Sequence, residues 1–113
     1  MSQVSGSEAS KVVGDLAERL TQVAAAVAED TDALAAAQAL PEQFQHLLAS
    51  LSASQRQPVQ PILTEMNRLM QLLQHHLMLW QRAKQKRPER VAQVQHDVQQ
   101  LQQFCQHLSQ NLE

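Results

Sequence analysis

Residues 88–112 carry the apolar pattern that most strongly constrains the fold of this chain. Apolar side chains recur there at spacings of three and four residues without interruption: Val91, Val94, Val98, Leu101, Cys105, Leu108 and Leu112. Such spacings form one stripe along an α-helix, and a repeat close to 3.5 residues favours a partner helix at a shallow angle. We therefore predict a helix from Pro88 onward that packs within an antiparallel bundle. A coiled coil between two copies would satisfy the same pattern, so a homo-oligomer stays open.

The amino-terminal part of the chain shows a second stripe of the same kind, made of Val13, Leu16, Leu20, Val23 and Val27. It predicts a long helix from Ser7 or Glu8 to about Gln38. Whether this helix is broken at residues 30–32 stays open, because aspartate is a weak helix former. Residues 1–7 are small and mostly polar, and we predict that they are disordered.

Prolines divide the rest of the chain. Pro41 suits the first turn of a short helix over residues 41–51, and residues 52–54 are predicted to form a turn. Pro58 and Pro61 indicate that the third helix begins between them, from where it runs to about Lys86. Its predicted inward-facing side chains are Ile62, Met66, Leu69, Leu73, Leu77 and Trp80.

These elements predict an all-α fold, a small antiparallel bundle of three long helices and one short helix, with residues 8–113 as a single domain. No run of apolar residues is long enough to span a membrane, and no leader peptide is visible. We therefore expect a cytoplasmic protein.

Composition argues against several functions. The chain has 113 residues, only two glycines and no tyrosine, which leaves little for phosphate-binding loops or for base stacking. Its pI near 6.2 argues against nucleic acid as a partner.

The residues that most often carry chemistry do not form a recognisable site. No two of the five histidines have the i,i+3 or i,i+4 spacing that a helical metal site needs: His46, His75, His76, His96 and His107. Cys105 falls on the apolar stripe, where a thiol is usually a small hydrophobic side chain. We therefore expect no catalytic residue, no metal and no cofactor, and predict that the protein is not an enzyme.

Charge is distributed unevenly. Residues 1–50 hold seven acidic and two basic side chains, a balance of −5, whereas residues 51–113 hold seven basic and four acidic ones, a balance of +3. Five of these bases, here called the basic corner, are Arg82, Lys84, Lys86, Arg87 and Arg90. Cations near the end of the third helix complement its dipole, which accounts for part of the cluster. The remainder suggests a docking site for an acidic partner.

Trp80 precedes the basic corner and has two interpretations. It closes the last layer of the core, or it is an interface anchor flanked by arginines. We favour the core role and keep Trp80 with the basic corner as a candidate partner-binding residue.

The carboxy-terminal half has a distinctive layout. A Leu-rich helix carries Glu65, Arg68 and Leu69 and ends in the Trp-Gln-Arg-Ala segment of residues 80–83. A basic stretch broken by Pro88 follows, and the last helix is rich in glutamine and contains Phe104 and Cys105. Over residues 64–108 this layout resembles the PatD family of cyanobacterial heterocyst frequency control proteins. The resemblance implies a small cytoplasmic helical regulator of cell division and differentiation. It also implies that the protein binds the division protein FtsZ and catalyses no reaction.

A function of another class stays open from the residues. Small helical bundles also serve as secretion or assembly chaperones, which hold an amphipathic client helix in an apolar groove. Met66, Met70 and Met78 would supply an adaptable lining for such a groove. A chaperone of this kind should leave one helix face uncovered, whereas a regulator with a closed bundle should not.

Overall fold

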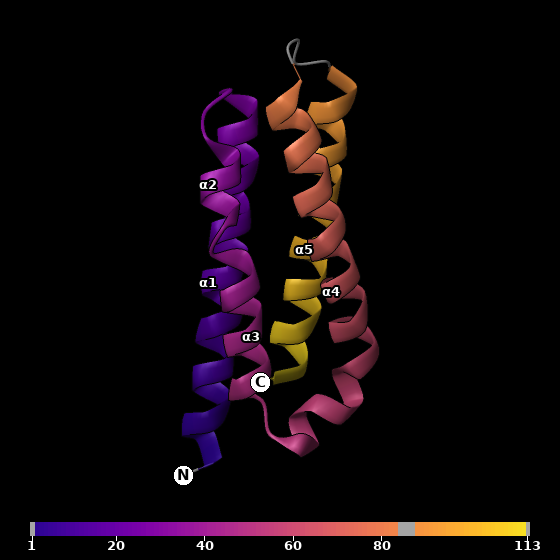
Figure 1. Ribbon diagram of the computed structural model, residues 1–113. Coiled ribbons are helices and arrows are strands. Elements are labelled where there is room, and N and C mark those ends of the chain that lie inside the picture. Colours follow the sequence, from indigo (N-terminus) through magenta and orange to yellow (C-terminus); the bar gives the residue numbers. More distant parts are fainter. Residues whose placement is uncertain (1, 84–87, 113) are drawn as a thin grey trace.

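The computed structural model describes residues 2–83 and 88–112 of the chain, with side chains from residue 8 onward. Helices are the only regular secondary structure among the described residues: α1 (Ser2–Ala28), α2 (Ala33–Ala37), α3 (Leu40–Ser50), α4 (Ala53–Arg82) and α5 (Pro88–Leu112). Figure 1 shows them side by side along one axis, and the molecule measures 52 × 21 × 19 Å. The predicted all-α bundle of three long helices and one shorter one is confirmed, with α2 and α3 together forming the shorter member. No helix in the described part of the chain is long and apolar enough to cross a lipid bilayer.

The first helix differs from the prediction at both ends. It begins at Ser2, before the predicted start at Ser7 or Glu8, and it ends at Ala28 instead of continuing to Gln38. The chain then reverses, so that α2 and α3 pack back along α1. The prediction of one helix to Gln38 is therefore wrong, and the long helix stops just before residues 30–32, where the sequence left a break open. Disorder of residues 1–7 in solution stays a prediction.

Hydrogen bonds explain why the chain turns at this point. Asp30 has a left-handed backbone with φ of 54°, while the Thr31 N–H donates to the Ala26 carbonyl at 2.8 Å and the Asp30 N–H donates to the Val27 carbonyl at 3.2 Å. These two bonds form a Schellman motif, which closes a helix when one residue adopts the left-handed conformation. Asp32 then begins α2, because its Oδ1 accepts a hydrogen bond from the Ala35 N–H at 3.0 Å.

The left-handed residue allows a stability prediction. An L-amino acid in this conformation costs about 1–2 kcal/mol, and glycine avoids most of that cost at an entropic loss of about 0.5–1 kcal/mol. We expect Asp30→Gly to raise the free energy of unfolding by about 0.5–1 kcal/mol, measured by urea denaturation. Glu29→Gly, one residue earlier and without a positive φ, is the control and should lower it. A loss of stability in Asp30→Gly would contradict the turn described above.

The start of α4 also corrects the prediction, because this helix begins at Ala53 and contains both Pro58 and Pro61. Ser52 caps it: the Ser52 Oγ accepts from the Gln55 N–H at 3.2 Å, and the Gln55 Oε1 accepts from the Ser52 N–H at 2.9 Å. This capping box satisfies the backbone N–H groups of Ser52 and Gln55 at the start of α4. Residues 52–54 therefore begin a helix, whereas a turn was predicted for them. The prolines are exposed and remove two helix hydrogen bonds near this end, and Figure 1 shows the first turns of α4 running obliquely before the helix straightens.

The other end of α4 lies at Arg82, before the predicted end near Lys86. Ala83 has an extended backbone, and its N–H donates to the carbonyls of Leu79 and Trp80. No large apolar side chain occurs between Trp80 and Val91, so burial does not offset the entropy lost by a longer helix. The predicted start of the last helix at Pro88 is confirmed.

The core lies along the centre of the bundle, where α5 packs against both α1 and α4. Of the predicted inward-facing residues of α4, Met66, Leu69, Leu73, Leu77 and Trp80 are buried, whereas Ile62 is only half-buried because Leu63 takes the core position. Two glutamines add polar links between helices. The Gln102 Nε2 donates to the Thr21 Oγ1 at 2.8 Å, and the Gln74 Nε2 donates to the Ala37 carbonyl at 3.1 Å.

Candidate interaction surface

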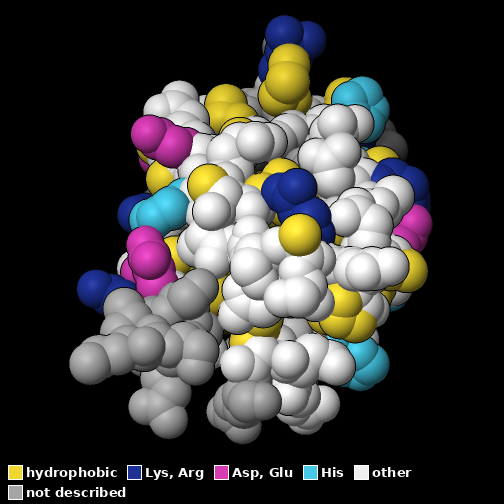
Figure 2. Space-filling view, turned by 90° about the horizontal axis from the view of Figure 1, so that it is seen from below, with side chains coloured by type: hydrophobic (Ala, Val, Ile, Leu, Met, Phe, Trp, Pro, Cys, Tyr) yellow, Lys and Arg dark blue, Asp and Glu magenta, His cyan; other side chains and the backbone are white. Residues whose placement is uncertain are grey.

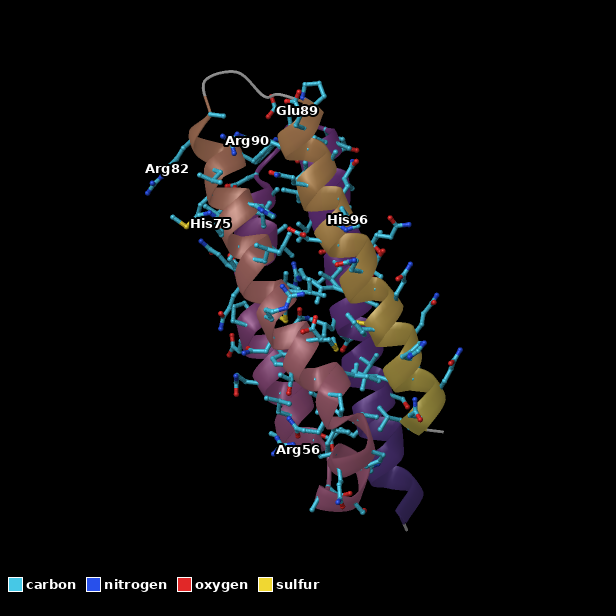
Figure 3. All side chains as sticks on the ribbon, turned by 90° about the vertical axis from the view of Figure 1, so that its right-hand side faces the viewer. Arg56, His75, Arg82, Glu89, Arg90 and His96 are labelled. Carbon is cyan, nitrogen blue, oxygen red and sulfur yellow. The ribbon has the colours of Figure 1, made fainter. Side chains whose placement is uncertain are left out.

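The basic corner is only partly within the described residues. Arg82 is exposed in the last turn of α4, and Arg90 is half-buried in the first turn of α5. Figure 3 shows both at the same end of the bundle, with the Arg90 side chain extending toward the end of α4. Lys84, Lys86 and Arg87 lie outside the described residues. The two described arginines thus come from different helices to the same end of the bundle, and the role of the basic corner as a docking site stays a prediction.

Acidic residues lie at the same end of the molecule. The turn after α1 contains the exposed residues Glu29, Asp30 and Asp32, and Figure 1 places this turn at the same end of the bundle as the end of α4 and the start of α5. Glu89, also exposed, precedes Arg90 in the first turn of α5. The upper end therefore carries both signs of charge on different elements. Two of the acids have structural roles, since Asp30 closes α1 and Asp32 caps α2.

The opposite end of the bundle has a different surface. Figure 2 shows it with hydrophobic side chains in small separate areas among polar atoms and with charged residues scattered around them. Arg56 lies toward this end, far from Arg82, in Figure 3, and its Nη2 donates to the Leu48 carbonyl at 3.1 Å. Arg56 therefore supports the end of α3 and provides a basic residue that is remote from the basic corner.

Trp80 belongs to the core. Its side chain is only 2% exposed and is among the largest fully buried ones of the chain. The closed bundle therefore does not offer this indole ring to a partner, and the core role that the sequence favoured agrees with its position. The ring supports the last layer of packing below Arg82.

A buried polar pair went unnoticed in the sequence. The Asp97 side chain on α5 is 4% exposed, and its Oδ2 lies 2.5 Å from the Nδ1 of His76 on α4, whose side chain is 16% exposed. The sequence did contain a signal, because Asp97 lies three residues after Val94 and beside Val98, next to the buried stripe of α5. A carboxyl group in that position needs a partner on a neighbouring helix.

The other histidines do not combine into a metal site. Within the described part of the chain, no three residues among histidine, cysteine, aspartate and glutamate are placed to hold an ion. His46 approaches the Glu8 carboxylate at 4.0 Å, and both side chains are more than half exposed. His75 and His96 are exposed on different helices, as Figure 3 shows.

Arg68 and Glu65, one turn apart on α4, form an exposed ion pair. The Arg68 Nε and Nη2 both donate to the Glu65 carboxylate, the shorter bond being 2.8 Å. The hydrogen bond from Arg68 lowers the pKa of Glu65, and the same bond raises the pKa of Arg68. An exposed pair of this kind contributes little to stability.

Cys105 is 2% exposed beneath a groove of about 690 Å³ between α1 and α5. Burial raises the pKa of its thiol to about 12, from an ordinary value of 9.0. The thiol is therefore neutral at physiological pH, and a nucleophilic role would require the thiolate.

This pKa leads to a prediction about alkaline stability. Below pH 9 the thiol is protonated in both states, so it adds no pH dependence. Between pH 9 and 12 the unfolded chain loses the proton while the folded protein retains it, so the free energy of unfolding falls as pH rises. At about pH 10.5 we expect a loss of about 2 kcal/mol from this group.

Urea denaturation at pH 8 and at about pH 10.5 measures this loss, with Cys105→Ala as the matched variant. Cys105→Ala should lose less stability than the natural protein between the two pH values. Equal losses in both proteins would show that the thiol is not buried as described.

Comparison with known proteins identifies no relative: no family model, curated protein or solved structure matches the chain.

Proposed function

We propose that this protein is a non-enzymatic regulator that acts in the cytoplasm by binding another protein through the basic corner. The observation that carries the proposal is the position of Arg82 and Arg90, which come from two helices to one end of a bundle with a closed apolar core. Arginines at one end of a helical bundle suit an acidic partner surface.

The proposed partner is the division protein FtsZ. The support is the resemblance of residues 64–108 to the PatD family, together with the charge of the basic corner, which suits an acidic surface. Trp80 contributes indirectly, because it packs beneath the helix end that carries Arg82.

The chaperone alternative lacks the groove that the sequence suggested. Met66 is fully buried and Met70 reaches the surface only at a small hollow between α3 and α4, so the three methionines do not form one continuous open groove. Among the described residues, Met78 is the large hydrophobic side chain that is exposed, at 42%. We therefore favour the regulator.

Charge reversal tests the basic corner. We expect Arg82→Glu/Arg90→Glu to weaken partner binding about tenfold or more, because each change replaces an attraction of up to about 1 kcal/mol with a repulsion. The purified protein serves as bait in a cyanobacterial lysate at low salt, and FtsZ recovered is quantified by mass spectrometry. The matched control is Lys11→Glu/Arg56→Glu, which makes the same change of charge away from the basic corner.

The control should recover as much FtsZ as the natural protein, provided that circular dichroism shows all three proteins folded. Equal recovery by both double variants would remove the basic corner as the contact surface. Recovery of a single helical client that is retained at high salt would favour the chaperone instead.

A further inference from the structure

One exposed face of α4 extends along the helix from Arg82 of the basic corner toward Gln71. Gln71, His75, Met78 and Arg82 follow one another at spacings of four, three and four residues, and all four side chains are exposed. These spacings place them on the same side of the helix, here called the α4 outer face. A single exposed methionine is ordinary on a protein surface. What distinguishes Met78 is that it lies on one helix face with Arg82 and with Gln71, which lines a hollow between α3 and α4.

A hollow of about 160 Å³ lies at the lower end of this face, between α3 and α4. Phe44 and Met70, which are 3% and 6% exposed, contribute apolar surface to it, and the rest of its lining is Pro41 and the amide side chains of Gln45, Asn67, Gln71 and Gln74. An apolar cavity of about 150 Å³ accepts a benzene molecule. The hollow is therefore large enough for one ring or one branched aliphatic side chain.

The distances along α4 match those of a second helix. Gln71 and Met78 are seven residues apart, which is about 10.5 Å along the axis. A helix lying along the α4 outer face presents residues i and i+7 at the same separation, which is the usual spacing of anchors in helix recognition. Its next turn, beyond the anchor on Met78, would reach Arg82, and carboxylates there would be attracted to Arg82 and Arg90.

We propose that the α4 outer face binds an amphipathic acidic helix of the partner protein. One apolar side chain enters the hollow at Phe44 and Met70, a second, seven residues away, covers Met78, and acidic residues beyond it lie beside Arg82 and Arg90. This inference rests on the proposed function and specifies the kind of segment that is recognised.

A second copy of this chain is a poorer occupant of the same face. Its most acidic helix, α1, buries its own apolar stripe, including Leu16 and Leu20, in its core. A folded copy can therefore present acidic residues but not two apolar anchors beside them. A partner segment whose apolar side is uncovered meets both requirements.

Methionine methyl groups allow a direct test, because Met66, Met70 and Met78 lie in the core, at the hollow and on the surface, respectively. The full chain, labelled with ¹³C in its methionine methyl groups, is titrated with a synthetic helical peptide. This peptide carries two leucines seven residues apart and three glutamates after the second leucine. We expect the NMR signals of Met78 and Met70 to shift while that of Met66 does not. A peptide of the same composition, with its leucines nine residues apart and so on opposite faces, should produce no such shifts.

Two variants sharpen the test. Met78→Asp should weaken the peptide about tenfold or more, as followed by the Met70 signal, because it replaces apolar contact with repulsion of the glutamates. Gln99→Asp, at an exposed position of α5, carries the same added charge and should leave the affinity unchanged.

Unchanged Met78 and Met70 signals at millimolar peptide would overturn the inference, as would equal shifts with the control peptide. Signals that change with protein concentration in the absence of peptide would identify a second copy as the occupant, which also overturns it. The proposed function fails separately, if FtsZ does not bind. If FtsZ binds through the basic corner without changing the Met78 and Met70 signals, only the inference about the α4 outer face is lost.

Discussion

Trp80→Ala is expected to lower the free energy of unfolding by about 3–5 kcal/mol, because it removes one of the largest fully buried side chains and leaves a cavity. A domain of this size is stable by only about 5–15 kcal/mol, so the variant should lose a large part of its stability. Urea denaturation followed by circular dichroism measures the change without depending on tryptophan fluorescence.

Two comparisons make the result specific. Trp80→Phe retains an aromatic ring and should lose much less stability than Trp80→Ala. Met78→Ala, two residues earlier on the exposed side of α4, should change stability by less than about 0.5 kcal/mol. If Trp80→Ala lost less than about 1 kcal/mol, the indole ring would not be in the core, and its role as an interface anchor would have to be reconsidered.

The pair formed by His76 and Asp97 gives the second large effect. His76→Leu leaves the buried Asp97 carboxyl group without this partner, which we expect to cost about 3 kcal/mol, because an isolated polar group stays out of water. Replacing both residues with leucine removes the group that needs a partner. The double variant His76→Leu/Asp97→Leu should therefore be at least as stable as the natural protein.

A double-mutant cycle in urea measures this coupling. The free energies of unfolding of the natural protein, the two single variants and the double variant are compared at one pH. Additive losses would mean that the two side chains do not interact across α4 and α5. A double variant that is stable but populates more than one oligomeric state would indicate that the pair helps to fix how the helices pack.

The helices themselves could be predicted from the sequence, but several of their ends could not. The stripe of α5 predicted its extent because one periodicity decided both the helix and its buried face. The end of α1 depended on whether Asp30 would adopt a left-handed backbone, which aspartate does less often than glycine. The start of α4 was misplaced because the prediction rested on the two prolines alone, whereas the capping box of Ser52 and Gln55 begins the helix before them.

The candidate surface could likewise be predicted only in part from the sequence. That Arg82 and Arg90 lie near each other followed from their places at the end of one helix and the start of the next. The link between His76 and Asp97 could not be predicted in the same way, because it depends on the register of α4 against α5. The α4 outer face likewise needed the position of α3, since the hollow is formed by side chains of two helices that are separated in the sequence.

The central claim is that the basic corner binds an acidic surface of FtsZ. Its most direct test is the dissociation constant of purified FtsZ with the natural protein, with Arg82→Glu/Arg90→Glu and with Lys11→Glu/Arg56→Glu, measured at low and at high salt. We predict that the natural protein and the Lys11→Glu/Arg56→Glu control bind FtsZ equally well at low salt. Arg82→Glu/Arg90→Glu should bind at least about tenfold more weakly. Added salt should reduce the difference in affinity between this variant and the natural protein. Equal affinities for all three proteins, or no binding by the natural protein, would contradict the claim.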